Sequence, residues 1–314
     1  MTSKQTTRHF LADDDLTPVE QAELIQLALA FKADPFGPKP LAGPKTVATV
    51  YDRPTLRTQV SFAAGIAELG GHPMNVDGGL AAMGKRESVE DVARVLGRQA
   101  SAIVWRTAHQ SDLVTMATYS GVPVVNALTD EFHPCQLVAD LLTITEAKGT
   151  TRDVKVTFIG DGACNMGNSW ALAGALAGMH LTFGVPRDYE PDARVIAKAS
   201  AIGESTGGTV VVDHDPVKAI AGADVVVTDT WVSMGRESQT SERLRIFSPF
   251  AVTEELFAHA SADAGFLHCL PAYRGKEVAA EVIDGPRSLV WDEAENRRHA
   301  QKAILAFLLD GSRR

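Results

Sequence analysis

The sequence predicts an α/β protein built from two doubly wound parallel-sheet domains. Short apolar runs rich in β-branched residues alternate with helix-length segments, which is the pattern of parallel sheets covered by helices. Ten such runs exceed what one compact sheet usually carries, and 314 residues allow two domains with full cores. The expected strands are residues 46–51, 73–76, 102–106, 123–126, 154–160, 181–185, 209–212, 224–229, 265–269 and 288–291.

The first helix is predicted from its N-terminal signals. Thr17 and Glu20 form a capping box, Pro18 occupies the first helical position, and apolar residues then recur at helical spacing as far as Lys32. The other expected helices are residues 59–70, 89–99, 136–147, 166–179, 192–205 and 296–309.

A polar segment at residues 146–153 marks the expected joint between the two domains. We therefore expect a first domain over residues 1–147 and a second over residues 148–292. The C-terminal helix, 293–314, is expected to pack back on the first domain. The active site is expected in the cleft between the domains.

Composition and charge exclude several classes of protein. The chain carries 30 Lys and Arg against 39 Asp and Glu, a net charge of −9, which argues against nucleic acid as a partner. The longest apolar stretch, residues 170–179, is too short to span a bilayer. The three cysteines form no CxxC pair, and the N-terminus has no apolar signal core, so we expect a cytoplasmic protein with reduced thiols.

Polar residues gather where the expected strands end. Open α/β sheets bind ligands at the carboxyl ends of their strands, so these clusters are candidate binding residues. They lie at residues 52–58, 106, 132–136, 160–165, 229–235 and 268–271.

The segment 55–58 has the features of an anion site. A strand, a tight turn and a helix beginning with Arg57 and Thr58 combine free backbone N–H groups with a guanidinium that matches phosphate oxygens. The alternative is a simple helix cap by Thr55 or Thr58 beside a solvated arginine.

Four of these clusters together resemble the aspartate/ornithine carbamoyltransferase family. Residues 55–59 are similar to its Ser-x-Arg-Thr-Arg phosphate motif, and 133–136 to its His-Pro-x-Gln. Asp229 with residues 233–235, and the His-Cys-Leu-Pro run at 268–271, resemble the two motifs of the ornithine branch. The resemblance extends from Arg8 to Arg297. It implies transfer of the carbamoyl group from carbamoyl phosphate to the δ-amine of L-ornithine, giving L-citrulline and phosphate in arginine biosynthesis.

The resemblance also assigns roles to residues at the carbamoyl-phosphate site. Arg57, Thr58 and Arg106 would bind the phosphate, and Arg106, Thr58 and His133 would surround the carbonyl oxygen. Taken alone, His133 would be interpreted as a helix-capping histidine before Pro134. The full carbamoyl-phosphate set is Thr55, Leu56, Arg57, Thr58, Arg106, His133, Gln136, Cys269, Leu270 and Arg297.

Ornithine has to react as a neutral δ-amine, although an unshifted alkyl amine titrates near ~10.4. The family pattern sets Asp229 and Cys269 near the substrate amines, so the implied catalytic set is Arg106, His133, Cys269 and Asp229. The alternatives are a strand-end cap for Asp229 and a small buried hydrophobe for Cys269. The residues implied to bind ornithine are Asn165, Asp229, Ser233 and Met234.

The sequence departs from the family pattern at several positions. Thr55 replaces the motif serine and keeps its hydroxyl, Leu56 offers only its backbone, and Gln59 replaces the second arginine. Ala82 stands where a neighbouring subunit usually lends a glutamine, and Cys164 replaces an asparagine. We expect weaker carbamoyl-phosphate binding or altered help between subunits.

Other partners and functions follow from the same residues. Lys85 and Arg86 stand near Ala82 and could serve a neighbour's site, which fits the homotrimer that the family implies. Neither His/Cys pair has zinc-ligand spacing, and Gly160, Gly162 and Gly167 do not form a dinucleotide motif, so no metal and no cofactor are expected. The alternatives are a sister carbamoyltransferase acting on N-acetylornithine, putrescine or lysine, and a non-catalytic binding or regulatory paralogue.

Overall fold

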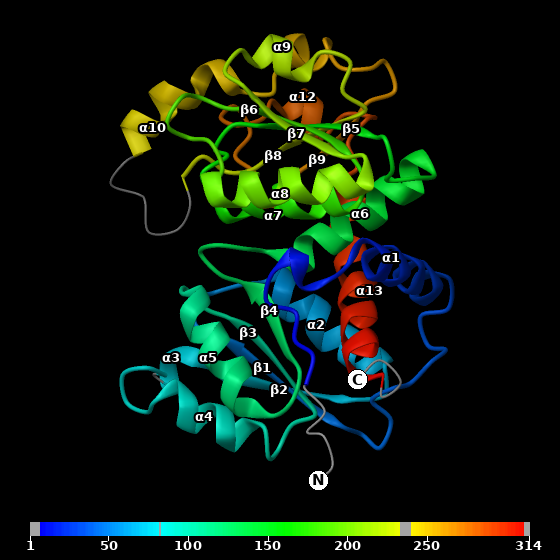
Figure 1. The fold of residues 1–314 in the computed structure, drawn as a ribbon, viewed down its shortest axis with the longest axis vertical. Helices are drawn as coiled ribbons and strands as arrows, with labels where there is room; N and C mark the ends of the chain where they lie inside the picture. Colours follow the sequence, from blue (N-terminus) through cyan, green and yellow to red (C-terminus); the bar gives the residue numbers. More distant parts are fainter. Residues whose placement is uncertain (1–6, 82, 233–239, 311–314) are drawn as a thin grey trace. The chain divides into compact units, whose positions relative to one another are not determined.

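Strands in the described part of the chain form two separate parallel sheets, one of four strands and one of five (Figure 1). The computed structural model describes residues 7–81, 83–232 and 240–310. Every strand pair within the two sheets is parallel, and helices cover the sheets. The predicted fold class, two parallel-sheet α/β domains, is therefore confirmed.

The chain divides into two units, the first of which combines the N-terminal part with the C-terminus. The first unit is Met1–Ala139 with Glu295–Arg314, and the second is Asp140–Ala294. The sequence predicted a boundary at 147/148, whereas the observed division falls inside the helix Pro134–Lys148. The polar segment at residues 146–153 includes the end of this helix, and the domain boundary expected there stays a prediction.

The first unit contains the four-stranded sheet, in the order β2-β1-β3-β4. Its strands are β1 (Thr46–Tyr51), β2 (His72–Asp77), β3 (Ala102–Arg106) and β4 (Val124–Leu128). Its helical elements are η1 (Asp13–Asp15), α1 (Pro18–Ala33), α2 (Arg57–Glu68), α3 (Gly78–Ala81), α4 (Val89–Leu96), α5 (Gln110–Ser120), the start of α6 (Pro134–Lys148) and most of α13 (Val290–Leu309).

The second unit contains the five-stranded sheet, in the order β7-β6-β5-β8-β9. Its strands are β5 (Lys155–Ile159), β6 (His180–Gly184), β7 (Thr209–Asp213), β8 (Val225–Thr228) and β9 (Gly265–Leu267). Its helical elements include α7 (Asn165–Leu176), α8 (Ala193–Thr206), α9 (Pro216–Ile220), α10 (Thr240–Phe247), η3 (Ser248–Phe250), α11 (Glu254–Phe257) and α12 (Ala280–Ile283). Within the described ranges, no helix has both the length and the apolar character that a bilayer span requires.

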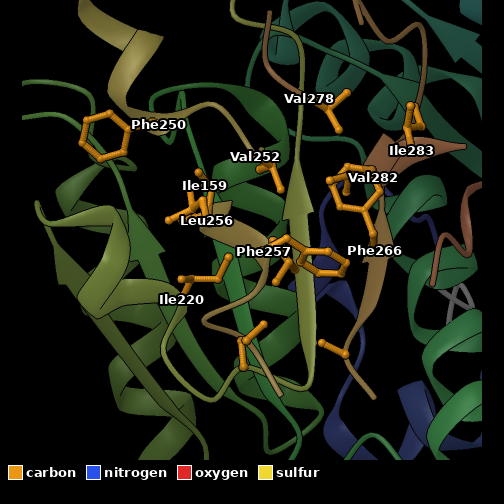
Figure 2. Close-up of a cluster of buried hydrophobic side chains, with 14 of the residues drawn as sticks. Ile159, Ile220, Phe250, Val252, Leu256, Phe257, Phe266, Val278, Val282 and Ile283 are labelled. Carbon is orange, nitrogen blue, oxygen red and sulfur yellow. The ribbon is translucent and has the colours of Figure 1, made fainter. Parts of the chain in front are cut away.

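Apolar side chains pack β8 and β9 of the second sheet against the helices of that unit. Figure 2 shows part of this core, where the rings of Phe257 and Phe266 meet edge to face with centroids 6.2 Å apart. Val226 on β8 and Val252 pack in the same cluster, and both are fully buried. Because these residues set the two strands, the polar residues that follow each strand are held at one edge of the sheet.

Helix α13 packs against α1 and α2 within the first unit (Figure 1). The Lys32 ammonium donates to Asn296 Oδ1 at 2.8 Å, and a Cβ added at Gly65 would lie 3.1 Å from the Lys302 side chain. The buried Lys302 ammonium reaches Glu68 at 2.6 Å. These contacts fix the residues of α13 that face α2.

The prediction of a strand at residues 288–291 is wrong. Ser288 forms only an isolated parallel bridge with Phe266, and α13 already begins at Val290 rather than at 296. Asp292 and Glu293 lie in the first turn of this helix, where negative charge is favourable. The local apolar run was therefore the start of a helix whose Val290 is buried in the core.

The capping box of α1 yields a stability prediction. Thr17 accepts from the Glu20 backbone N–H, and Glu20 accepts in return from the Thr17 N–H at 2.9 Å. We expect Thr17→Ala to lower the free energy of unfolding by about 1 kcal/mol, because the Glu20 N–H loses its side-chain acceptor, while the bond from the Thr17 N–H to Glu20 remains. Urea denaturation measures the change. Thr17→Ser keeps the hydroxyl and should stay close to the wild type, and equal losses in the two variants would contradict the capping role.

Candidate active site

In the first unit, one hydroxyl brings together two arginines from distant parts of the chain. Thr58 Oγ1, in the first turn of α2, accepts from Arg297 on α13 at 2.9 Å and from Arg106 at the end of β3 at 3.4 Å. All three side chains are buried. The parallel register of β1 and β3 ends both strands at the same edge, so the residues after β1 and the last residue of β3 meet there.

The first turn of α2 adds backbone donors to this cluster. Leu56 precedes the helix, its side chain is 72% exposed, and it makes no side-chain cap. The N–H groups of the first turn have no acceptor within the helix and lie at its positive end. Arg57, at the first helical position, adds a third guanidinium. This segment therefore has the positive charge and the free backbone N–H groups that an anion site requires.

His133 lies among the same charges. It is buried just before α6, and burial together with neighbouring positive charges holds its pKa well below the usual value. Those charges belong to Arg297, Arg106 and Arg57. The imidazole is therefore neutral at neutral pH and offers one ring N–H as a donor without needing to be protonated. Gln136, also buried, lies one turn further along the chain.

Tyr51 is a neighbour of this cluster that the sequence did not indicate. It ends β1 in register with Arg106. Burial raises its pKa to about 12, although the nearby charges of Arg297 and Arg106 act to lower it. Its hydroxyl therefore stays protonated. Its place at the end of a predicted strand, just before the segment expected to bind an anion, could have indicated that it lies near this cluster.

In the second unit, Asp229 and Cys269 form a pair at the ends of neighbouring strands. Asp229 follows β8 and Cys269 lies just beyond β9. The Cys269 thiol donates to Asp229 Oδ1 at 3.3 Å, and the Thr230 N–H donates to the same oxygen at 2.7 Å. The sheet order sets β8 beside β9, which explains the proximity of residues forty positions apart.

Burial shifts both members of this pair toward their neutral forms. It raises the pKa of the Asp229 carboxyl, while the neighbouring His268 acts to lower that pKa. It also raises the pKa of Cys269 well above its usual value, with nearby carboxylates adding to the effect. Cys269 is therefore a thiol and not a thiolate at neutral pH, and Asp229 is the stronger candidate for accepting a proton.

His268 completes a compact polar group with the pair. One donor atom from each of Asp229, His268 and Cys269 lies within 4.8 Å of the others. These donor types also bind metal ions, so the expectation of a site without metal stays a prediction.

Two of the remaining expected site residues, Asn165 and Leu270, lie in the described part of the second unit. Asn165 begins α7 and is half-buried, and the Cys164 thiol before it donates to the Asp161 carbonyl at 3.0 Å. Leu270 follows Cys269 with a left-handed backbone, φ 57°. Ser233, Met234 and Ala82 lie outside the described residues.

The fold and the two clusters define the class of this protein as a parallel α/β enzyme with two units. A family model for the aspartate/ornithine carbamoyltransferase carbamoyl-P binding domain matches residues 8–146, and one for the Asp/Orn binding domain matches residues 152–308. The chain belongs to the aspartate/ornithine carbamoyltransferase family, as the resemblance predicted.

Relatives cover the whole chain. It is 58% identical over 303 residues to the ornithine carbamoyltransferase of Clavibacter michiganensis subsp. michiganensis, with 96% of this chain and 99% of that protein covered. The ornithine carbamoyltransferase of Renibacterium salmoninarum is 54% identical over 310 residues, covering 98% of this chain and 100% of that one. Among solved structures, the ornithine carbamoyltransferase from Pyrococcus furiosus has a TM-score of 0.93 at 43% identity and 98% coverage of both chains. The anabolic enzyme from Campylobacter jejuni has a TM-score of 0.91 at 35% identity, covering 96% of this chain and 98% of that one.

Proposed function

We propose that this chain transfers the carbamoyl group of carbamoyl phosphate to the δ-amine of L-ornithine, yielding L-citrulline and phosphate in arginine biosynthesis. The observation that carries the proposal is the convergence of Arg106 and Arg297 on Thr58, beside the first turn of α2. This cluster supplies positive charge and backbone donors to a small dianion in a chain whose net charge is −9. Membership of the family and the names of its relatives support the same reaction.

In the proposed mechanism, the first domain holds carbamoyl phosphate. Arg57 and the N–H groups of residues 55–58 bind the phosphate, with Arg106 reaching both the phosphate and the carbonyl oxygen. The neutral His133 imidazole donates to the same carbonyl oxygen, where negative charge develops in the tetrahedral intermediate. A donor at such a position typically contributes ~3–4 kcal/mol to barrier lowering. Gln136 accepts from the carbamoyl NH2, and Arg297 fixes Thr58.

The second domain, in this proposal, prepares the amine. Asn165, Ser233 and Met234 hold the amino-acid end of ornithine, together with Asp229. A carboxyl whose pKa is raised by burial holds a proton more readily than an exposed one, so Asp229 takes the proton that leaves the δ-amine. The neutral Cys269 thiol donates to Asp229 and orients it. The amine then attacks the carbonyl carbon. As the tetrahedral intermediate collapses, the nitrogen gives its second proton to the phosphate, which leaves with the electrons of the C–O bond.

The direct test is citrulline formation from carbamoyl phosphate and ornithine by the purified chain. The same assay is run with N-acetylornithine, putrescine and lysine as the amine. Turnover with ornithine at the highest kcat/KM supports the proposal, and a preference for another amine of this panel would replace the substrate while keeping the reaction. Absence of turnover with all four amines would favour a binding or regulatory role.

We propose that the active form is a homotrimer in the cytoplasm, with each site near a subunit interface. The exposed Lys85 and Arg86 are available to a neighbouring subunit and follow the position of Ala82 closely. Light scattering of the active protein tests the assembly. A fully active monomer would contradict the shared site.

Gln59 gives a prediction about carbamoyl-phosphate binding. It is exposed in the first turn of α2, where the family motif has a second arginine. We expect Gln59→Arg to lower the KM for carbamoyl phosphate by about threefold, a modest gain because the added charge is solvent-screened. Steady-state kinetics at saturating ornithine measure it.

The matched control is Gln99→Arg, which adds the same charge at an exposed position after α4. Its KM should remain that of the wild type. An unchanged KM in Gln59→Arg, or an equal fall in both variants, would contradict the role of position 59.

A further inference from the structure

A buried histidine–glutamate pair lies next to Cys269 and has no part in the proposed mechanism. His268 follows β9, and its Nε2 lies 3.5 Å from Glu277 Oε1. Both side chains are buried, at 0% and 1% exposure. A buried acid beside a buried imidazole is costly to desolvate, so its presence next to the proposed catalytic pair calls for a reason beyond packing.

Backbone groups fix both partners of this pair. The Leu270 N–H donates to His268 Nδ1 at 2.9 Å, so Nδ1 is the accepting nitrogen and Nε2 is the ring nitrogen that faces Glu277. The Tyr273 N–H donates to Glu277 Oε1 at 2.5 Å. The His268 N–H donates to Glu293 Oε2 at 2.9 Å. The imidazole itself is held by the bond at Nδ1 and faces the Glu277 carboxylate at Nε2, while the other two bonds fix Glu277 and the His268 backbone.

The segment that the imidazole holds is strained. Leu270 has φ 57°, a left-handed backbone that a leucine rarely adopts. Non-glycine residues keep such a conformation only where the surrounding structure imposes it, and these positions cluster at functional sites. The Leu270 N–H donates to His268 in this conformation. Cys269 lies between these two residues, with its thiol on Asp229.

We propose that Glu277 is a positioning residue for the reaction. Through Nε2 it fixes the ring of His268, the ring holds the Leu270 backbone in its left-handed form, and this sets the direction of the Cys269 thiol toward Asp229. The inference rests on the proposed function, because Asp229 and Cys269 take their chemical roles from it. Glu277 touches neither substrate in this scheme and acts only through His268.

The first experiment compares kinetics of the wild type, Glu277→Gln and Glu277→Asp. Glu277→Gln keeps the shape and removes the charge that attracts the imidazole, so kcat should fall about tenfold or more. The KM for carbamoyl phosphate should stay within about twofold, because the arginine cluster is untouched. Glu277→Asp keeps the charge on a shorter chain and should recover part of kcat. The matched control, Glu281→Gln, changes an exposed carboxylate on α12 and should match the wild type.

The second experiment needs no turnover. Iodoacetamide alkylation is followed by mass spectrometry at Cys269, with the half-buried Cys164 as internal reference. Loss of the Glu277 charge should free the thiol from Asp229 and speed alkylation of Cys269 about threefold or more relative to Cys164. If the wild type makes no citrulline, the proposed function fails, while this measurement still decides the positioning.

A purely structural pair would give a different result. In that case Glu277→Gln would lower the free energy of unfolding but leave kcat per folded site and the relative alkylation rate unchanged, which overturns the proposal. Should Glu277→Gln fail to fold, Glu277→Asp decides. A kcat and an alkylation rate equal to those of the wild type in Glu277→Asp would then overturn it.

Discussion

An Arg57→Ala variant should lose kcat/KM for carbamoyl phosphate by about three orders of magnitude, equivalent to about 4 kcal/mol of transition-state binding. Arg57 begins α2, where its guanidinium adds to the charges of Arg106 and Arg297. Carbamoyl phosphate is a dianion, and a guanidinium binds two phosphate oxygens at once. Alanine removes both bonds and one charge, while the helix start remains. Citrulline formation over a range of carbamoyl phosphate concentrations measures the loss.

The control for this prediction is Arg53→Ala, which removes the same group from an exposed position in the same loop. It should retain activity within about twofold of the wild type, because a solvated arginine away from the α2 N-terminus is screened. A less than tenfold loss in Arg57→Ala would argue against the phosphate role. Equal losses in both variants would indicate that only the general charge of the loop matters.

Most strands were predictable from the sequence because they depend on local patterns, and so was the meeting of polar residues at their ends; the binding roles of those residues rest on the family resemblance and stay predictions. Thr46–Tyr51 and Ala102–Arg106 are short β-branched runs bounded by polar residues, and the structure has strands with these bounds. Since parallel strands end at a common edge, Arg57 and Arg106 were expected to be neighbours, and both contribute charge at His133.

Long-range partners were not predictable in the same way. Glu277 lies nine positions from His268 in a segment with no regular period, and only the packing around β9 brings its carboxylate to the ring. Residues 288–291 have a strand-like composition, yet the acidic first turn and the buried face of α13 make them helical. Tertiary packing overrides a short local preference in both cases.

The largest expected loss of stability comes from Arg243 on α10. Its guanidinium donates to Asp161 Oδ2 and to the Trp231 carbonyl, and the Arg243 and Asp161 side chains are only 3% and 1% exposed. The rings of Tyr189 and Phe247 lie 5.3 and 4.9 Å from the guanidinium carbon. Arg243→Met keeps most of the volume but leaves the Asp161 carboxylate buried without its cation. We expect the free energy of unfolding to fall by about 3–5 kcal/mol.

Two comparisons separate loss of the cation from loss of packing. The pair of Arg194 and Asp192, 2.8 Å apart in the same unit, is a matched control because its arginine is exposed, and Arg194→Met should cost less than about 1 kcal/mol. Adding Asp161→Leu to Arg243→Met removes the stranded charge, so the double variant should be more stable than Arg243→Met alone. Urea denaturation followed by tryptophan fluorescence measures all four proteins. A double variant no more stable than Arg243→Met would mean that the stranded Asp161 carboxylate is not the source of the loss, contrary to this prediction.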